Sequence, residues 1–347
     1  MELNAVAVDL AKSVFQLSLA DTKYRVQSRK RLSRAQFRKF ICTQAPMHLV
    51  MEGCATSHYW GRFAQSQGHQ VTLLHPNYVK PYVRRNKTDS ADADALLRAV
   101  QDPELKPIPV KSEDHQALQS LHRLRERLKS TRVAHLNCAR ALLAEFGISL
   151  PKLCGEGRLV EAVEQVPELM RSALLNFIEQ SKTLMQQLKG IDMQLTAFAK
   201  QDPICQQLLP MPSLGVTTVT AMVARVPDIH VFSRGRSFSN WLGITAREHS
   251  SGNTRHMGRI TKQGDTYLRT LLIHCARSGL LLIRRKVAKE ESLTRLERWA
   301  YQLEQRVGTT KLQLHWQISK HGSSGPYGPG ARLLMGMMQS ASLTRNE

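Results

Sequence analysis

The fold is decided by two short runs near the start of the chain: Asn-Ala-Val-Ala-Val-Asp at residues 4–9 and Val-Phe-Gln-Leu-Ser-Leu-Ala at residues 14–20. The first is apolar until it ends in Asp9. The second alternates apolar with polar residues, and both patterns are typical of strands. A basic third run at residues 24–32 completes an expected antiparallel meander.

The next residues alternate between helix and strand patterns. Ser33 is expected to cap a helix that continues through Cys42, and a buried strand at residues 48–51 ends at Glu52. A helix at 57–67 and a strand at 70–74 follow. Strands first, then strands that alternate with helices, predict an α/β domain with a mixed sheet. Asp9 and Glu52 each end a predicted strand, at the sheet edge where ligands gather in such folds.

An acidic stretch follows, Asn-Lys-Thr-Asp-Ser-Ala-Asp-Ala-Asp-Ala at residues 86–95. Its alanines predict a helix with Thr88 or Asp89 as the N-cap. Asp89 and Asp92 then share one helical face, while Asp94 points elsewhere. If this helix packs across the strand ends, four carboxylates converge and provide the hard oxygen ligands that suit Mg²⁺ or Mn²⁺. The alternative is an acidic first turn that complements the helix dipole, with Asp9 as a strand-end turn former and Glu52 as a helix-capping or ion-paired residue.

The charge balance points to nucleic acid as the partner. The 347 residues include 49 Lys and Arg against 28 Asp and Glu, which gives a net charge of +21 spread along the chain. Arg84, Arg85 and Lys87 lie just before the acidic stretch. No apolar run approaches the roughly 18 residues of a membrane-spanning helix. The first residues lack a signal-peptide pattern, so we expect a cytoplasmic protein, and six scattered cysteines without a CxxC pair argue against zinc.

Two long helices are expected in the middle of the chain. Leucines recur at near-heptad spacing from Leu118 to Leu136 in a helix that ends near Gly147, and a second helix runs from about 167 to 200. They predict an antiparallel hairpin or a dimerising coiled coil. Arg123 and Arg127 on the first helix form either a solvated face or a nucleic-acid contact.

The last third carries two candidate phosphate sites. Backbone N–H groups at residues 214–216, where a Pro/Gly turn opens a helix, are one; a plain turn is the alternative reading. The other is a loop of serines, glycines and cations between two apolar helices. Its candidate residues are Ser250, Ser251, His249, Arg255, Arg259, Lys262 and Arg269, and a solvated loop is the alternative reading.

The motifs Val-Asp-Leu-Ala-Lys at 8–12, Met-Glu-Gly at 51–53 and Asn-Lys-Thr-Asp-Ser-Ala-Asp-Ala at 86–93 resemble the catalytic domain of DEDD transposases of the insertion-sequence 110 family, 1111 group. The resemblance implies a ribonuclease-H-like, resolvase-like domain. Its metal-binding carboxylates would be Asp9, Glu52, Asp89 and Asp92. It also implies that Ser251, or else its neighbour Ser250, becomes covalently joined to DNA. Donor and target DNA, a structured guide RNA and a dimeric to tetrameric assembly at the bacterial nucleoid are the implied partners and setting.

The expected architecture is α/β plus α. A catalytic domain at 1–102 precedes a linker and helical, coiled-coil region at 103–202, and a mainly helical C-terminal transposase domain at 203–310 carries the serine loop. The resemblance ends near residue 311. We hypothesise that residues 311–347 come from a frameshifted reading of the ancestral gene and form a disordered tail.

Three functions fit these residues. The first is a transposase that uses Ser251 as nucleophile together with a Mg²⁺ carboxylate site. The second is a metal-dependent junction endonuclease that hydrolyses DNA with water and uses Ser251 only to bind phosphate. The third is a non-catalytic basic nucleic-acid-binding protein, for which the carboxylates would be dispensable.

Overall fold

The computed structural model describes residues 4–83, 89–151, 154–211, 213–226, 231–232, 235–252, 254 and 256–307. The chain divides into two compact units, Met1–Gln116 and Ala117–Glu347. Five of the residues singled out from the sequence, Arg84, Arg85, Lys87, Thr88 and Arg255, lie outside the described part, as does the side chain of Asp89. So does the tail at 311–347.

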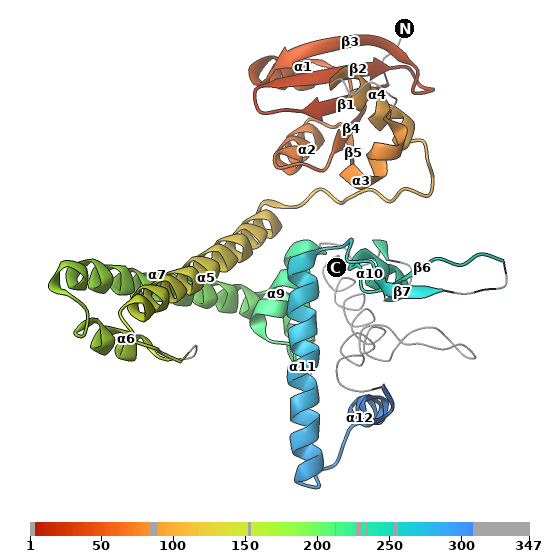
Figure 1. Cartoon of the computed structure of the whole chain (residues 1–347). Helices are drawn as coiled ribbons and strands as arrows, with labels where there is room; N and C mark the ends of the chain where they lie inside the picture. The colour runs from red at the N-terminus through yellow and green to blue at the C-terminus, as the bar shows by residue number, and fades with distance from the viewer. Residues whose placement is uncertain are drawn as a thin grey trace. The chain divides into compact units, whose positions relative to one another are not determined.

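A five-stranded mixed sheet forms the centre of the first unit, with strand order β3-β2-β1-β4-β5 (Figure 1). β1 and β3 pair antiparallel with β2, whereas β4 pairs parallel with both β1 and β5. This confirms the predicted mixed sheet, because the meander needs only tight turns while the parallel strands follow helical crossovers. The strands are β1 (Ala5–Leu10), β2 (Val14–Ala20), β3 (Val26–Ser33), β4 (His48–Glu52) and β5 (Gln70–Leu74).

Helices cover both faces of this sheet. On one face Phe37 of α1 (Arg34–Thr43) and Trp60 of α2 (Ser57–Ser66) pack against Phe15 and its apolar neighbours. On the other, Leu96 of α4 (Asp89–Ala99) packs against the small side chains of β1 and β4. Ser33 caps α1 as predicted, with the Gln36 side chain completing a capping box. The short helices α3 (Pro76–Val79) and η1 (Lys80–Tyr82) follow β5.

The first unit continues past residue 102, where we expected a linker to begin. The Ile108 N–H donates to the Leu73 carbonyl at 2.7 Å, which adds a bridge to the edge of β5. Val110 packs so closely on Gly61 that a Cβ there would meet it at 3.0 Å. Arg62 of α2 donates to the Lys111 carbonyl at 2.7 Å. This segment therefore belongs to the sheet core rather than to a free linker.

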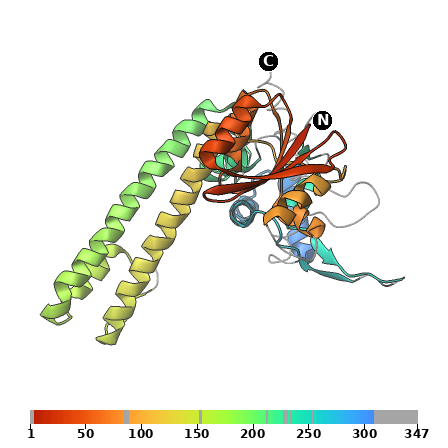
Figure 2. The same ribbon diagram turned by 90° about the horizontal axis from the view of Figure 1, so that it is seen from above.

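Two long antiparallel helices, α5 (Glu113–Glu145) and α7 (Glu168–Gln201), begin the second unit, with α6 (Glu156–Val163) between them in sequence (Figure 2). Leu118 clusters with Leu195 and Leu143 with Leu174, which is the pairing of an antiparallel hairpin within one chain. The Arg132 guanidinium and the Ser181 hydroxyl both donate to Glu156 Oε1, at 2.7 and 2.9 Å. Glu156 thus joins the two helices through α6. A coiled coil between chains stays a prediction.

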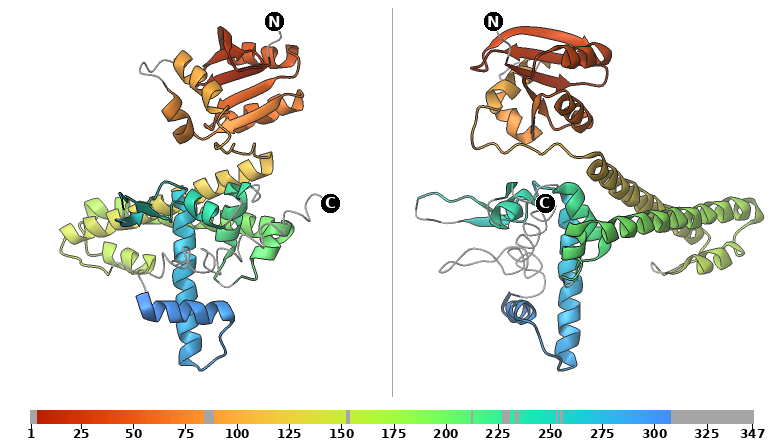
Figure 3. Two further views of the ribbon diagram at one scale, coloured as in Figure 1. Left: turned by 90° about the vertical axis from the view of Figure 1, so that its right-hand side faces the viewer. Right: turned by 180° about the vertical axis from the view of Figure 1, so that it is seen from behind.

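The rest of the second unit is mainly helical, as predicted. Its core gathers around α9, where Val219 and Met222 pack with Leu268 of α11, while α12 packs against the other end of α11 (Figure 3). α9 begins at Val216 after an N-cap at Gly215, as expected from the Pro/Gly turn. The elements are α8 (Pro203–Leu208), α9 (Val216–Arg225), α10 (Gly235–Trp241), β6 (Ala246–Glu248), β7 (Met257–Ile260), α11 (Thr266–Ala288) and α12 (Arg295–Val307).

The helices of the described ranges include none that is both long and apolar enough to span a membrane.

Candidate functional site

Asp9 and Glu52 occupy neighbouring strands at the same edge of the sheet. Val8 pairs with Met51 across the parallel strands β1 and β4, so the next residue of each strand is one of the two carboxylates. Alternation along a strand gives Asp9 the same face as Ala7, and Glu52 the same face as Val50. Ala7 and Val50 belong to the cluster beneath α4. The two carboxylates are therefore side by side on the face that α4 covers.

The helix α4 brings the other acidic candidates to this face. It packs on β1, β2 and β4 through Ala95, Leu96 and Ala99. Asp92 is half-buried in its first turn, three residues after Asp89, so the two occupy one helical face. The three-dimensional arrangement thus brings the elements that carry all four predicted carboxylates to one face of the sheet.

Asp94, which we placed on a different helical face without a role, ties α4 to the sheet. It accepts hydrogen bonds from the Ser18 hydroxyl on β2 at 2.6 Å and from the Arg29 guanidinium on β3 at 2.7 Å. Burial would raise the pKa of the Asp94 carboxyl, but the hydrogen bonds from Arg29 and Ser18 outweigh it and lower that pKa. Asp94 therefore stays ionised and fixes where the first turn of α4 stands.

The donor set suits a hard divalent cation in its chemistry, since it consists of carboxylate oxygens. Within the described residues no three His, Cys, Asp or Glu side chains stand close enough together to hold a metal ion. The Asp89 side chain falls outside that set. The structure therefore agrees with the predicted metal site in the chemical type of the ligands and in the elements that carry them.

The predicted serine loop forms a β-hairpin of β6 and β7. The sequence did not predict these strands, because strands of three and four residues are too short to show an alternating pattern. Near its tip the backbone N–H of Ser251 donates to the Thr254 carbonyl at 3.2 Å, and the Thr254 N–H returns a bond at 3.1 Å. Gly252 between them has a φ of +55°. The Ser250 hydroxyl donates to Glu248 Oε1 at 2.8 Å. Both serines are exposed, so either hydroxyl can meet a substrate.

The base of the hairpin is held by a close backbone approach. The Lys262 N–H donates to the Gly243 carbonyl at 2.9 Å, and a Cβ on Gly264 would stand 1.9 Å from the Trp241 carbonyl oxygen. Only glycine fits there.

The cations predicted to orient phosphate fall into two groups. His249, Arg259 and Lys262 are exposed on the hairpin, and Arg123 and Arg127 are exposed on α5. Arg269, in contrast, is buried, and its guanidinium donates to the carbonyls of Leu242 and Gly264 at 2.9 and 3.2 Å. Arg269 therefore holds the hairpin base and is not accessible for the phosphate contact that we expected.

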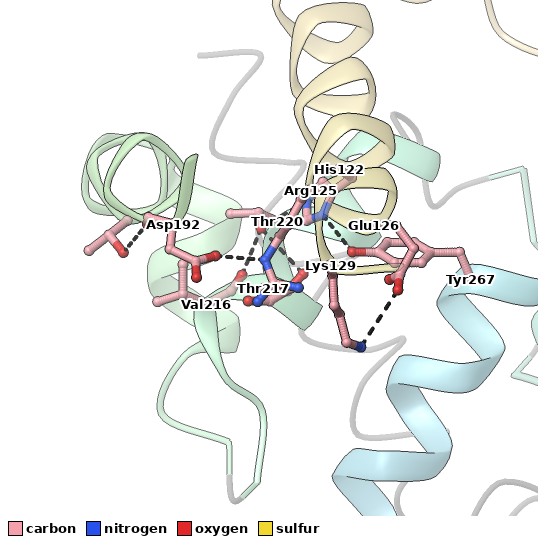
Figure 4. Close-up of polar contacts among 10 residues, drawn as sticks. His122, Arg125, Glu126, Lys129, Asp192, Val216, Thr217, Thr220 and Tyr267 are labelled. Atoms are coloured by element: carbon pink, nitrogen blue, oxygen red, sulfur yellow. Dashed lines mark hydrogen bonds and ion pairs between the residues drawn. The ribbon is translucent and has the colours of Figure 1, made fainter. Parts of the chain in front are cut away.

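A buried polar network links α5, α9 and α11 (Figure 4). His122 Nε2 is 3.1 Å from the Thr220 hydroxyl, and Nδ1 is 3.0 Å from the Tyr267 hydroxyl. Because the Thr220 proton is donated to the Val216 carbonyl at 2.7 Å, Thr220 accepts from Nε2–H. The neutral ring then accepts the Tyr267 proton at Nδ1.

This network contains residues that the sequence interpretation missed. Arg125 Nε pairs with Asp192 Oδ1 at 2.6 Å next to His122, and Arg225 pairs with Asp265, the N-cap of α11, also at 2.6 Å. His122 stands four residues after Leu118, on the apolar stripe of its helix. That position is the signal that indicates a buried histidine.

Two family models match the chain. One, described as "Transposase IS116/IS110/IS902 family", matches residues 205–291, and another, described as "Transposase", matches residues 6–148. The first range includes the serine hairpin, and the second includes the strands and the helix that carry the four carboxylates.

Several proteins are similar over most of the chain. A "Probable family 20 transposase" of Pseudomonas aeruginosa is 38% identical over 80% of this chain and 84% of its own length. The "Transposase for insertion sequence element IS1328" of Yersinia enterocolitica is 33% identical over 78% and 82%. The "Transposase for insertion sequence element IS1111A" of Coxiella burnetii is 32% identical over 83% and 81%.

Proposed function

The chain belongs to the IS116/IS110/IS902 family of transposases, and on that premise we propose that it cuts and rejoins DNA with a carboxylate site in its first unit and a serine nucleophile in its second. It is a transposase of an insertion sequence, so DNA is its substrate. The observation that carries the proposal is the placement of Asp9 and Glu52 on adjacent strands under α4.

Carboxylate oxygens are the ligands that a hard divalent cation prefers, and such a cation offsets the repulsion between neighbouring carboxylates. We assign Asp9, Glu52, Asp89 and Asp92 as the ligands of Mg²⁺ or Mn²⁺ in a ribonuclease-H-like domain. When bound, such an ion stabilises charge on a phosphoryl oxygen and activates a hydroxyl. The residues of the chain supply the rest: Asp94 fixes α4, and the sheet fixes the strand ends.

The serine step is a phosphoryl transfer. Ser251 Oγ forms a bond to a DNA phosphorus and the bond from that phosphorus to the DNA leaving oxygen breaks, so the chain holds the DNA through a phosphoserine. The serine proton passes to a base and the leaving oxygen takes up a proton. Ser250 is the alternative nucleophile. Its hydroxyl donates a hydrogen bond to Glu248 Oε1 at 2.8 Å, and Glu248 would act as the base that activates it.

Further partners belong to the same proposal. A structured guide RNA would choose the site by base pairing, and a dimer or tetramer would hold two DNA duplexes. A net charge of +21 suits both nucleic acids. We assign the backbone contacts to accessible cations or cations outside the described part: Arg84, Arg85, Lys87, Arg123, Arg127, Arg255, Arg259 and Lys262.

The test is a search for a covalent adduct. The purified chain is incubated with Mg²⁺, labelled element-junction DNA and RNA transcribed from the element's flank, then run on a denaturing protein gel. We expect labelled protein, and we expect none with Ser251→Ala, Asp9→Asn or Asp89→Asn. Ser250→Ala is the matched control, and it should retain the adduct.

Other outcomes separate the alternatives. An adduct that survives Ser251→Ala but not Ser250→Ala assigns the nucleophile to Ser250. Cleaved DNA without an adduct in any sample indicates a nuclease that uses water. Binding that is unaffected by Asp89→Asn, without any cleavage, contradicts a catalytic role for the carboxylates.

A further inference from the structure

One face of the first unit, formed by β3 and α1, is strongly basic and takes no part in the site described above. No acidic residue occurs between Asp21 and Glu52, while eight lysines and arginines do. We call the α1/β3 face the exposed cations of these two elements that lie on the side of the sheet covered by α1 and are not paired with a carboxylate among the described residues: Lys30, Arg34, Arg38 and Lys39.

Three of these cations are held in place by aromatic rings of the core. The Arg38 guanidinium lies 4.9 Å from the centre of the Phe63 ring, and that of Arg34 lies 5.5 Å from the Trp60 ring. Lys30 Nζ lies 5.6 Å from the Phe40 ring. Cation–π contacts of this kind orient a side chain without neutralising its charge. The entropy cost of immobilising these side chains when a ligand binds is therefore smaller than on an ordinary lysine-rich surface.

Arg29, on the same strand, is a cation whose charge is neutralised by an ion pair. It is paired with Asp94 at 2.7 Å, which uses its charge to hold α4. In the described part of the chain no carboxylate does the same for Lys30, Arg34 or Arg38. The positive charge of the α1/β3 face is therefore available for an anionic partner.

The shape of the face selects the kind of anion. Proteins that bind single strands stack the bases on exposed aromatic rings. Here Phe15, Phe40 and Trp60 are buried, 0%, 9% and 3% exposed, beneath the cations. Arg34 and Arg38 are four residues apart on α1, which is a rise of about 6 Å along the helix axis. The Phe63 ring beneath Arg38 is half-buried, so the rings that these cations contact are at least partly covered, and a row of cations above covered rings fits the backbone of a duplex.

We propose that the α1/β3 face binds the phosphate backbone of duplex DNA without reading its sequence. The inference rests on the proposed function, because that function supplies DNA as the substrate. The α1/β3 face is a DNA-binding surface in addition to the cations assigned above to contacts with the nucleic-acid backbone.

Arg31, the neighbour of Lys30 on β3, points to the other face of the sheet, which is the face of Asp9. Arg31 pairs with Gln16, and Gln16 pairs with Asp9, so the three residues form one row across β3, β2 and β1. Two strand spacings amount to about 10 Å. The strand that carries Asp9 is therefore about 10 Å from the edge strand that carries Lys30 and Arg31.

The competing explanation is protection of an edge strand. β3 ends the sheet, and charged side chains on edge strands prevent pairing with another chain. That explanation predicts aggregation when the charges are removed and no change in the affinity of the soluble protein for DNA.

The experiment compares two triple variants of the full chain. One is Lys30→Gln, Arg38→Gln and Lys39→Gln; the other is Lys189→Gln, Lys200→Gln and Lys289→Gln, which removes equal charge from exposed positions of the second unit. Affinity for a short labelled DNA duplex, and for an RNA duplex of the same length, is measured in EDTA over a range of KCl concentrations. Circular dichroism and gel filtration check folding and solubility.

We expect the α1/β3 variant to bind at least about tenfold more weakly at low salt, with a salt slope reduced by about 1 for each cation that contacts phosphate. The control should stay within about twofold of the unchanged chain on the same scale. An equal loss in both variants would overturn the proposal. So would a loss confined to a duplex RNA probe, or aggregation with unchanged DNA affinity.

Failure here is distinguishable from failure of the proposed function, because binding in EDTA requires no chemistry. If the proposal holds, the α1/β3 variant still forms the serine adduct at saturating DNA, whereas Ser251→Ala binds DNA normally and forms none.

Discussion

His122 is a buried side chain whose protonation should set the acid limit of stability in the second unit. Burial lowers its pKa to about 4, and the nearby charges of Arg225 and Arg125 act in the same direction. In the unfolded chain the pKa returns to about 6.5. Between pH 6.5 and 4 the unfolded state therefore binds a proton that the folded state does not.

We expect the free energy of unfolding to fall as the pH drops from 6.5 to 4, by up to about 3 kcal/mol from this group. In His122→Gln, whose amide can replace both hydrogen bonds but cannot titrate, this part of the pH dependence should vanish. Urea unfolding of both proteins across that range measures it. Parallel curves for the two proteins would show that His122 does not titrate in this window.

Gly264 is a residue for which the tertiary structure leaves no alternative. A Cβ there would stand 1.9 Å from the Trp241 carbonyl oxygen. We expect Gly264→Ala to destabilise the second unit by more than about 3 kcal/mol, since the backbone contact at the hairpin base must open. The matched control is Gly190→Ala in α7, where a Cβ meets nothing within 4 Å. It should stabilise the helix by up to about 1 kcal/mol. Thermal unfolding compares the two, and similar melting temperatures would contradict the close approach.

At the scale of elements, α4 is positioned by one carboxylate rather than by its apolar face alone. Asp94 accepts from Ser18 on β2 and from Arg29 on β3, so it sets where the first turn of the helix stands over the strands. The catalytic candidates Asp89 and Asp92 belong to that turn. A residue outside the metal set should therefore control the activity of the set.

We expect Asp94→Ala to destabilise the first unit by about 1–3 kcal/mol, because it leaves Ser18 and Arg29 without their acceptor. Adduct formation should fall while DNA binding is retained. Arg29→Gln is the control: its guanidinium is half exposed, so it should cost less than about 1 kcal/mol. Hydrogen exchange of the α4 amides measures the loosening directly. Equal protection in Asp94→Ala and the unchanged chain would contradict this role.

The serine hairpin shows the same principle in the second unit. Gly243, Lys262 and Gly264 close its base by backbone contact, and Arg269 fills the space beneath. The tip that carries Ser250 and Ser251 is thereby presented on a short two-stranded ribbon. The proposed nucleophile is thus at an exposed tip, and buried backbone contacts at the base hold the ribbon that carries it.

At the scale of the whole molecule, the two units have separate apolar cores. The two clusters around the sheet use only residues up to Val110, and the cores of the second unit begin at Leu118. The proposed carboxylates and the proposed nucleophile thus belong to different units. The proposed function therefore needs residues of both units, from one chain or from two.

The extent of the first unit gives a direct test. We expect a fragment of residues 1–116 to fold by itself with a cooperative transition. A fragment of residues 1–102 should be less stable by at least about 2 kcal/mol, because it loses the burial of Ile108 and Val110 and the hydrogen bonds of Arg62. Circular dichroism in urea measures both. Equal stability of the two fragments would indicate that the first unit ends at residue 102.

The sequence by itself determined the secondary structure of the first unit and the family of the chain. The period-two pattern of β2, the Ser33 cap and the two long helices follow from local spacing, which is why their predicted ranges agree with the structure. The motifs around Asp9, Glu52 and Asp89 were enough to indicate the transposase family. The catalytic roles of these residues stay predictions.

Only the tertiary structure decided how residues far apart in the chain are used. It shows that Arg269, which we expected to bind phosphate, is buried and donates to the Leu242 carbonyl. It also shows that Asp94 holds α4 to β3 through Arg29, and that His122 contacts the Tyr267 hydroxyl. It also returned the segment through Ile108 to the sheet. Local spacing fixes the face of an element on which a side chain stands. Whether that face meets solvent, a carboxylate or a backbone carbonyl depends on packing between distant segments, which no local pattern contains.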